Sequence, residues 1–310
     1  MKQRLFKQVD VFTDKPYFGN PLAVVLDGSG VDDDAMQRFA RWTNLSETTF
    51  LLPPTDPSAD YRVRIFTPGG ELPFAGHPTL GSCHAWLQTG GQPQGKDFIV
   101  QQCKVGLVKI RREPNRMEGR RLAFAAPPLK RAAPDPALLA QVAAALSLQA
   151  PQILASQLLD NGPVWLALLL DRVETVLQLA PNHLELAKLD VKVGVVALYP
   201  PEEESPLIGR ANREARAFAH DAPQTIIDAP DMEVRAFAAA IGVNEDPVTG
   251  SLNASLAQWL VAEGHAPERY IASQGVCLGR AGQVYLERDA AGQVWVGGES
   301  ATCIDGQVTL

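Results

Sequence analysis

The sequence predicts an α+β protein built from two pseudo-symmetric domains. Short β-branched segments bounded by Gly, Pro or Asp run through most of the chain, and such segments are typical of strands. A strand–loop–helix unit occurs twice, at residues 61–87 and 232–260. Residues 124–136, between the two copies, are rich in Pro and Ala, which is typical of a connection between domains. With 310 residues the chain is long enough for two such domains.

Strands dominate the prediction for the first part of the chain. Residues 32–44 are predicted to form a helix, because their first turn is acidic and apolar residues follow at helical spacing. Residues 77–91 are predicted to form a second helix that ends at a pair of glycines. The predicted strands are "LFKQVDVF" (5–12), "PLAVVLD" (21–27), "TTFLLPP" (48–54), "YRVRIFTP" (61–68), "DFIVQQC" (97–103) and "GLVKIRRE" (106–113).

The second part begins with a predicted helix and continues with strands. The helix is "PALLAQVAAALSL" (136–148), and "ESPLIGRANRE" (204–214) is predicted to be a loop. The chain closes with a predicted hairpin at 283–298 and a last segment at 301–310. The other predicted strands are "APQILASQ" (150–157), "VWLALLL" (164–170), "VGVVALYP" (193–200) and "EARAFAH" (214–220).

Composition and charge exclude several classes of protein. A net charge of −7 leaves no basic surplus for general nucleic-acid binding, and the Arg-rich residues 109–121 are interpreted as a solvated hairpin surface. The start of the chain alternates charged and apolar residues, unlike a signal peptide, and the longest apolar run is too short to span a bilayer. The cytoplasm is therefore the expected compartment, with no membrane partner. The four cysteines, with no C-x-x-C among them, suggest neither a disulfide framework nor a metal site: Cys83, Cys103, Cys277 and Cys303.

The internal repeat carries most of the structural information. Both copies contain V-R-x-F, a Gly-containing connector, P-x-x-G-S-x-x-A and an apolar helix with a Trp. The repeat also decides that "EVRAFAAAIG" (233–242) is a strand despite its helix-forming residues, because its counterpart "YRVRIFTPGG" (61–70) is extended. The alignment pairs Pro78 with Pro247, Gly81 with Gly250, Ser82 with Ser251 and Ala85 with Ala254.

Each repeated helix is predicted to begin at its Pro-x-x-Gly. Proline is tolerated in a first turn, and glycine lets a ligand approach the free amides, which favour a bound anion together with the helix dipole. An ionisable residue precedes each proline, namely His77 in one copy and Asp246 in the other. If the two domains face each other, both helix starts converge on one cleft that can bind a carboxylate or a phosphate.

Glu47 is a third candidate, because it follows Ser46 at the start of an otherwise apolar strand. An apolar environment raises the pKa of a carboxyl group, which suits a general acid/base near neutral pH. Taken singly, each residue also has a purely structural interpretation. Glu47 fits a surface strand end, His77 a capping histidine, Asp246 an N-cap and Ser251 a helix-start residue. His84, on the same helix face as His77, is interpreted as packing, and "GNP" (19–21) as a tight turn whose Asn20 can contact a ligand.

Five motifs in this order resemble the PhzF-like proteins, named for the phenazine-biosynthesis isomerase. The resemblance extends from about residue 6 to about residue 300 and implies the diaminopimelate epimerase fold, with a mixed, curved sheet around a central helix in each domain. The implied domains are 1–125 and 126–298, with 299–310 expected to complete the first. The motifs are "DVFTDKPYFGNPLAVVLD", "LSETTFLLP", "IFTPGGELPFAGHPTLG", "EDPVTGS" and "QGVCLGRAGQVYLE".

The resemblance also implies a cofactor-free isomerase that moves a proton on a small carboxylic acid, which is trans-2,3-dihydro-3-hydroxyanthranilate in the phenazine isomerase. It places the acid/base glutamate at Glu47 and the other catalytic groups at His77 and Asp246. Substrate-binding positions are expected at Ser46, Asn20, Gly76, Gly250 and Ser251. The sequence departs from many members at Ala239, where they have Pro, and at Leu252, where they have Ala. A larger residue at a helix start can reshape the pocket.

Three functions are compatible with these residues. The first is the isomerase, with fixed donors stabilising a carbanion or dienol. The second is a cofactor-independent racemase or epimerase of the same fold, whose two thiols are not matched here, because His77 and Asp246 occupy the repeated positions and the cysteines lie elsewhere. The third is a non-enzymatic carboxylate-binding protein, which would not need Glu47. A homodimer is expected from the family.

Overall fold

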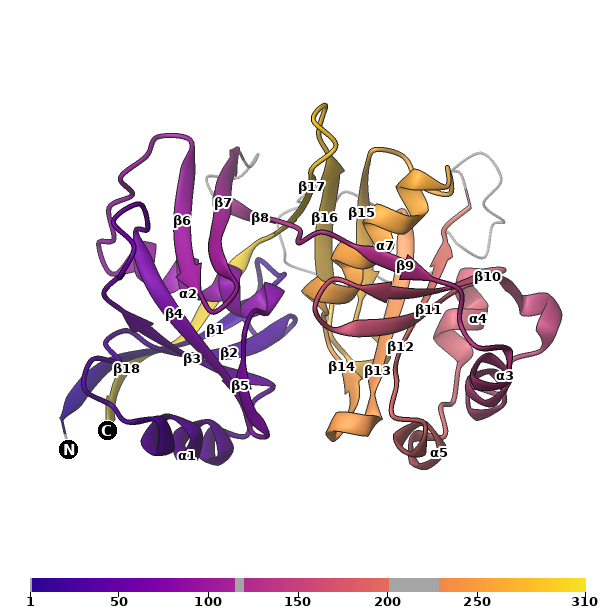
Figure 1. Ribbon diagram of the computed structural model, residues 1–310, viewed down its shortest axis with the longest axis horizontal. Coiled ribbons are helices and arrows are strands. Elements are labelled where there is room, and N and C mark those ends of the chain that lie inside the picture. The colour runs from indigo at the N-terminus through magenta and orange to yellow at the C-terminus, as the bar shows by residue number, and fades with distance from the viewer. Residues whose placement is uncertain (1, 115–119, 201–228) are drawn as a thin grey trace, which may run out of the picture.

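The computed structural model describes residues 2–114, 120–200 and 229–310, and these form two halves that lie side by side (Figure 1). The N-terminal half contains β1 (Gln3–Val11), β2 (Asn20–Val25), α1 (Asp33–Thr43), β3 (Glu47–Leu52), β4 (Tyr61–Thr67), β5 (Gly70–Leu72), α2 (Gly76–Gln88), β6 (Phe98–Cys103), β7 (Gly106–Pro114) and β8 (Arg120–Ala125).

The C-terminal half follows, and the last strand, β18 (Ser300–Thr309), returns to the N-terminal half. The C-terminal half contains β9 (Lys130–Ala132), α3 (Pro136–Ala145), β10 (Ile153–Asp160), β11 (Val164–Leu170), α4 (Val173–Gln178), α5 (His183–Lys188), β12 (Lys192–Leu198), β13 (Met232–Ala238), β14 (Val243–Asp246), α7 (Gly250–Ala262), β15 (Arg269–Gln274), β16 (Gly282–Arg288) and β17 (Val294–Gly298). Short 3₁₀ turns lie at Ala150–Gln152, Ala239–Ile241 and Val276–Leu278.

The predicted α+β class is confirmed, and the predicted strands and helices are present wherever the structure describes the chain. The predicted loop at 204–214 and the predicted strand at 214–220 lie outside the described residues. The structure adds α4, α5 and four strands, β5, β9, β14 and β15, that the pattern did not predict. Most of these elements have only three to six residues, too few to show a clear hydrophobic period.

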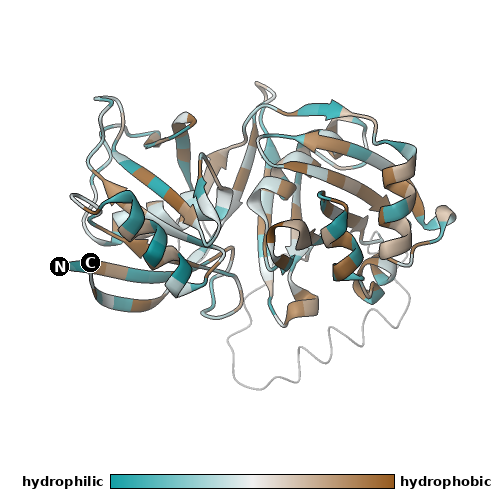
Figure 2. Ribbon diagram, turned by 60° about the horizontal axis from the view of Figure 1, so that its bottom comes forward, coloured by the Kyte–Doolittle hydropathy of each residue, from teal (hydrophilic) through white to brown (hydrophobic). Residues whose placement is uncertain are grey.

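Each half wraps its strands around one central helix. In the N-terminal half, α2 packs against β1, β2, β3, β8 and β18, and in the C-terminal half α7 packs against β10, β16 and β17. Both helices have 13 residues, and most of them are buried. Hydrophobic and hydrophilic residues alternate along several strands (Figure 2), and along β6 every second residue is buried.

Helix α1 lies on the outside and buries only one face, unlike the two central helices. Its N-cap is Asp32, whose side chain accepts a hydrogen bond from the Ala35 amide at 2.7 Å, and its C-cap is Asn44 in a left-handed conformation. Met36, Phe39 and Ala40 of α1 are buried. No helix in the described parts of the chain is long and apolar enough to cross a membrane.

The structure confirms the strand predicted at 233–242, since β13 covers its first part, but it corrects the predicted helix starts. Helix α2 begins at Gly76, before Pro78, and α7 begins at Gly250, so Gly76 rather than Gly81 corresponds to Gly250. Gly81 lies inside α2, where an added Cβ would lie 2.6 Å from Leu22 Cδ2. Gly81 is therefore a packing glycine, which allows α2 to lie close to β2.

Strand β18 pairs antiparallel with β1 over its full length, from Val11–Ser300 to Gln3–Thr309. The two chain ends of the structure therefore lie together at the outer edge of the N-terminal half (Figure 1). This pairing is the one expected if residues 299–310 complete the first domain. The domain limits at 125 and 298 stay a prediction.

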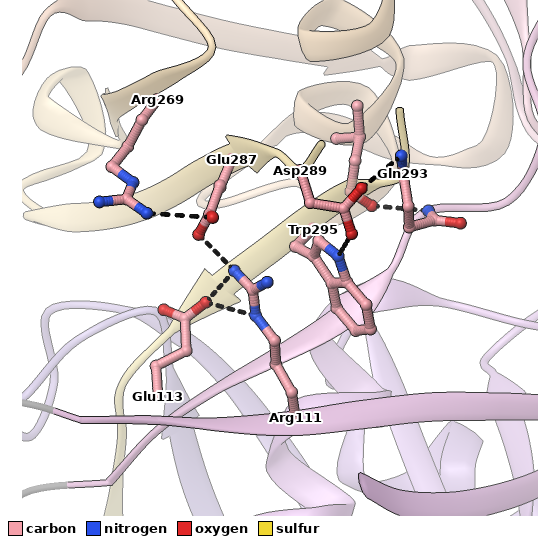
Figure 3. A network of polar contacts seen from close by, with 8 residues as sticks. Arg111, Glu113, Arg269, Glu287, Asp289, Gln293 and Trp295 are labelled. Atoms are coloured by element: carbon pink, nitrogen blue, oxygen red, sulfur yellow. Dashed lines mark hydrogen bonds and ion pairs between the residues drawn. The ribbon is translucent and has the colours of Figure 1, made fainter. Parts of the chain in front are cut away.

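The Arg-rich segment forms a hairpin as predicted, through the antiparallel pairing of β7 with β8, but Arg111 is not merely solvated. Arg111 donates hydrogen bonds to Glu113 and, across the halves, to Glu287, at 2.5 Å each (Figure 3). Its guanidinium group lies over the Trp295 ring, 4.6 Å from the centroid. We call this group, with Arg269 bound to Glu287, the β7–β16 network. It joins the halves away from their central helices.

Candidate active site

The starts of α2 and α7 meet between the two halves. A Cβ built on Gly250 would lie 3.1 Å from the Gly76 Cα, and a Cβ built on Gly76 would lie at the same distance from the Gly250 Cα. Only glycine permits such an approach of two backbones. The pseudo-symmetric helices thus bring their positive ends to one place, as the repeat predicted.

The first amides of both helices are left without side-chain caps. The N-cap residues are Ala75 and Thr249, both extended, and neither side chain accepts a hydrogen bond from its helix. Thr249 instead donates its hydroxyl to Asp246 Oδ2 at 2.6 Å. Uncapped amides at two facing helix starts favour an anion, and the dipole adds about 0.3–2 kcal/mol.

Glu47 and His77 face each other beside these helix starts. Glu47 opens β3, which pairs in parallel with β2, and His77 is in the first turn of α2. Glu47 Oε2 lies 3.3 Å from His77 Nε2, with the two side chains 15% and 6% exposed. In the described part of the chain neither atom has a hydrogen-bond partner, so the two groups are close but not aligned. Two unpaired buried atoms that face each other, each able to carry a proton, make this contact a candidate for proton transfer.

Burial changes the protonation of both groups. Burial and, to a smaller extent, the nearby Asp246 carboxylate raise the pKa of Glu47 to about 8, against the opposing effect of Lys192. Burial lowers the pKa of His77 to about 3. At neutral pH the pair is therefore mostly a protonated carboxyl group beside a neutral imidazole, which suits proton transfer near neutral pH.

Asp246 comes from the C-terminal half but is held from both halves. Asn20 Nδ2 donates to Asp246 Oδ1 at 2.9 Å and to the Val248 carbonyl at 2.9 Å. Burial raises the pKa of Asp246 to about 6, although the hydrogen bonds from Thr249 and Asn20 lower it. Asn20 thus connects β2 to the start of α7, and its contact with a ligand stays a prediction.

The remaining predicted residues have contacts or burial of their own outside the Glu47–His77 pair. Ser251, in the first turn of α7, accepts a hydrogen bond from Trp165 Nε1 at its hydroxyl (3.2 Å). Ser46 is half-buried in the bend before β3. His84 contacts Thr302 of β18 at 3.0 Å, which agrees with its interpretation as packing.

The two departures from the family pattern do not enter the Glu47–His77 contact. Leu252 is fully buried and lies against Gly194 of β12, where an added Cβ would be 2.4 Å from Leu252 Cδ1. The larger residue is thus accommodated by a glycine in the core. Ala239 begins the 3₁₀ turn after β13.

Sequence reasoning missed two residues next to the site, Trp165 and Lys192. Trp165 lies inside the predicted strand 164–170, where nothing distinguishes it from its apolar neighbours, which are expected to be buried. Lys192 opens β12 and interacts electrostatically with both Glu47 and Asp246. No motif marks either residue, because both reach the site through strand pairing rather than through sequence spacing.

Solved structures show the fold. A phenazine biosynthesis protein of the PhzF family from Bacillus anthracis superposes with a TM-score of 0.78 at 22% identity, with 100% of each chain covered. A probable proline racemase from Agrobacterium radiobacter superposes with a TM-score of 0.62 at 13% identity, with 99% of this chain and 93% of the other covered. The two halves, each built around a helix, are therefore the diaminopimelate epimerase type of fold, as the sequence predicted.

Sequence relatives define the class of protein more closely. The chain is 33% identical over 319 residues to antisense-enhancing sequence 1 of Schizosaccharomyces pombe, with 99% of each chain covered. It is 31% identical over 309 residues to the trans-2,3-dihydro-3-hydroxyanthranilate isomerase of Pseudomonas aeruginosa, with 97% of this chain and 98% of the relative covered. With this fold and these relatives, the protein is an isomerase. It belongs to the phenazine biosynthesis-like (PhzC-PhzF) family, whose model matches residues 9–306.

Proposed function

We propose that the protein is a cofactor-independent isomerase that moves a proton on a small carboxylic acid resembling dihydrohydroxyanthranilate. The observation that carries the proposal is the buried contact of 3.3 Å between Glu47 and His77, next to two glycine helix starts. The uncapped amides at Gly76 and Gly250 hold the substrate carboxylate. Glu47 is then the acid/base group, and Asp246 and Ser251 bind other polar atoms of the substrate.

The proposed reaction has two proton transfers and no net gain or loss of atoms. The Glu47 carboxylate takes a proton from one substrate carbon, and the C–H electron pair enters the conjugated system of the acid. The charge that develops is stabilised by the helix-start amides, which are already oriented. The protonated Glu47 then returns the proton to another carbon, which regenerates its carboxylate. Neutral His77 lies beside Glu47 and does not compete for this proton, because burial lowers the pKa of His77 to about 3.

A thiol-based racemase is a weaker alternative for this chain. Burial raises the pKa of all four thiols, that of Cys83 to about 12. The charged or hydrogen-bonding neighbours that affect the four thiols do not include Glu47, His77 or Asp246. A pair of thiolates flanking a substrate carbon at the helix starts is therefore not supported.

Deuterium exchange tests the proposal. The protein is incubated in deuterated water with trans-2,3-dihydro-3-hydroxyanthranilate and a panel of amino acids, and exchange is followed by NMR, with Glu47→Gln as the matched variant. Exchange that Glu47→Gln abolishes is the expected result. Exchange of an amino-acid α-hydrogen that survives this substitution indicates the epimerase. Saturable binding without any exchange indicates the carboxylate-binding protein.

We also propose that the protein acts as a homodimer in the cytoplasm. The proposal of a dimer comes from the family resemblance, and light scattering tests it directly, because a monomer has a mass of 33.5 kDa. A mass near this value over a range of protein concentrations would exclude the dimer. The acidic balance, with a net charge of −7, agrees with a small-molecule substrate rather than a nucleic acid.

A further inference from the structure

Lys192 lies on the wall of the site that the C-terminal half provides. In the parallel pairing of β11 with β12, Lys192 is the partner of Trp165. Its ammonium group lies over the Trp165 ring, 5.7 Å from the centroid. Trp165 Nε1 donates in turn to the Ser251 hydroxyl in the first turn of α7. The aromatic ring therefore holds a cation beside the helix start where the substrate carboxylate is proposed to bind.

Lys192 acts on the two carboxyl groups across space. Burial lowers the pKa of Lys192, while Glu47 and Asp246 raise it. Lys192 in turn lowers the pKa of both carboxyl groups. Lys192 is half-buried, and within the described residues it forms no direct ion pair. Its ammonium group can therefore act on more than one carboxyl group.

Glu47 and Asp246 are two buried carboxyl groups that influence each other electrostatically, and two such groups cannot both ionise easily. Asp246 accepts hydrogen bonds from Asn20 and Thr249, which stabilise its anion. Glu47 Oε2 has no such donor and faces the neutral His77. The hydrogen bonds thus make Asp246 the ionised member and Glu47 the protonated one.

The neighbouring charged residues Glu245 and Arg235 bind each other and not the site residues. Glu245 precedes Asp246 in β14, but successive side chains of a strand point to opposite faces. Glu245 is bound to Arg235 at 2.8 Å, and Arg235 also donates to the carbonyls of Val176 and Leu179. Among the described residues, the charged and titratable groups placed at the site are thus Lys192, Glu47, His77 and Asp246.

We propose that Lys192 is a positioning residue, whose ammonium group, held over the Trp165 ring beside the start of α7, offsets the Asp246 charge that would oppose a bound carboxylate. Without Lys192, the Asp246 anion would repel an acidic ligand at the adjacent helix starts. With it, the net side-chain charge of the site is close to zero, and the two helix starts attract one carboxylate. The part of this inference that concerns binding rests on the proposed function, whereas the part that concerns Asp246 and Glu47 does not.

Carboxyl ¹³C NMR titration tests the charge role without any substrate. The resonances are assigned with Glu47→Gln and Asp246→Asn, and the titration midpoints are compared in the wild type, Lys192→Met and Lys192→Arg. We expect Lys192→Met to move both midpoints upward by about one pH unit, because a nearby cation is lost. Lys192→Arg leaves them near the wild-type values. Lys188→Met is the matched control, because Lys188 is exposed and paired with Glu185.

Equilibrium binding tests the second role, with anthranilate and its carboxamide, anthranilamide, as probes. Lys192→Met is expected to weaken anthranilate binding about tenfold while the neutral amide changes less than about twofold. Equal losses for both probes, or unchanged midpoints in folded Lys192→Met, would overturn the inference. Lys192→Gln replaces Lys192→Met if the latter does not fold. Failure of wild-type turnover would reject the proposed function, but the titration would still decide the role of Lys192.

Discussion

The two halves of the protein meet at the helix starts and again at the β7–β16 network, and the polar groups at these two junctions are satisfied to different degrees. In the network, Arg111 and Arg269 both bind Glu287 (Figure 3). Burial raises the pKa of Glu287, but these ion pairs outweigh it and the pKa is lowered. At the helix starts, Glu47 and His77 keep unpaired atoms, and the pKa of Glu47 is raised to about 8.

We interpret this difference as one between a junction that holds the halves together and a junction that is proposed to bind a ligand. Charges that are fully paired contribute to the native state, and they leave no group free for chemistry. Buried groups without partners cost stability unless a ligand completes them. The contrast predicts which substitutions affect activity and which affect only folding.

The largest expected effect is that of Glu47→Gln on proton exchange. The amide keeps the shape of the side chain but cannot take up a proton, so exchange should fall by about 10²–10⁴-fold, the usual contribution of a general acid/base. The rate is measured by NMR in deuterated water. Glu287→Gln, in the β7–β16 network, is the matched control and should stay within about twofold of the wild type. Comparable losses in both variants would remove the distinction between the junctions.

Gly76→Ala should have the next largest effect. The new Cβ would lie 2.8 Å from Phe124 Cζ and 3.1 Å from the Gly250 Cα, so the helix starts must separate. Misplacement of catalytic groups by such shifts costs on the order of 10²-fold in activity. Gly306→Ala in β18 is the control, since nothing lies within 4 Å of a Cβ there. Activity and melting temperature are measured together. Unchanged activity in Gly76→Ala would show that the close approach is not needed.

The pH profile of kcat/KM should rise through the pKa of Glu47. If the ionised carboxylate takes the first proton, activity falls about tenfold for each pH unit below about 8 and reaches a plateau above it. The profile is measured between pH 5 and pH 9.5 in buffers of constant ionic strength, with near-UV circular dichroism to confirm folding. A profile that falls through pH 8 would instead make the protonated Glu47 the starting form.

Glu47→Gln should also stabilise the protein at alkaline pH. The folded pKa of Glu47, about 8, lies above its ordinary value of 4.5, so its contribution to stability is complete below pH 4.5 and is lost as pH rises to 8. Removing the titration should therefore raise the free energy of unfolding by roughly 4–5 kcal/mol at pH 8.5 and change it little at pH 4.5. Urea denaturation at both pH values measures this difference. A constant effect at both pH values would contradict the raised pKa.

The smallest expected effect on catalysis is that of Arg111→Met. This substitution removes the ion pairs across the halves and the cation–π contact with Trp295, worth about 1 kcal/mol in all. Thermal unfolding should shift down by a few degrees, while exchange activity stays within about twofold. A large loss of activity would mean that the β7–β16 network also positions the helix starts.

Much of the arrangement could be predicted from sequence because the chain repeats its own pattern. The repeat predicted that β13 is a strand, although its composition favours a helix. It also predicted that His77 and Asp246 lie on elements that face each other. It failed in register, since it paired Gly81 with Gly250. Glycine is needed at Gly76 for the contact between helices and at Gly81 for packing against β2, and the sequence does not distinguish these two reasons.

The contacts between halves could not be predicted. Asn20 reaches Asp246 across 226 positions, and Lys192 reaches the site because β12 pairs with β11. Neither contact can be recognised from the neighbouring sequence, because the hydrophobic pattern of a strand predicts only which residues are buried and not which residues they contact. The same limit explains Arg111, whose partner Glu287 is 176 positions away in the chain.

The pairing of β1 with β18 has a consequence for the order in which the protein folds. Lys7 binds Asp305 across 298 positions, so the sheet around α2 cannot be completed when its own residues leave the ribosome. It stays open until nearly all of the C-terminal half has been synthesised. Contacts of such long sequence separation slow folding. The nascent protein therefore exposes the edge of β1 for most of translation, and that edge is where a chaperone would be expected to bind first.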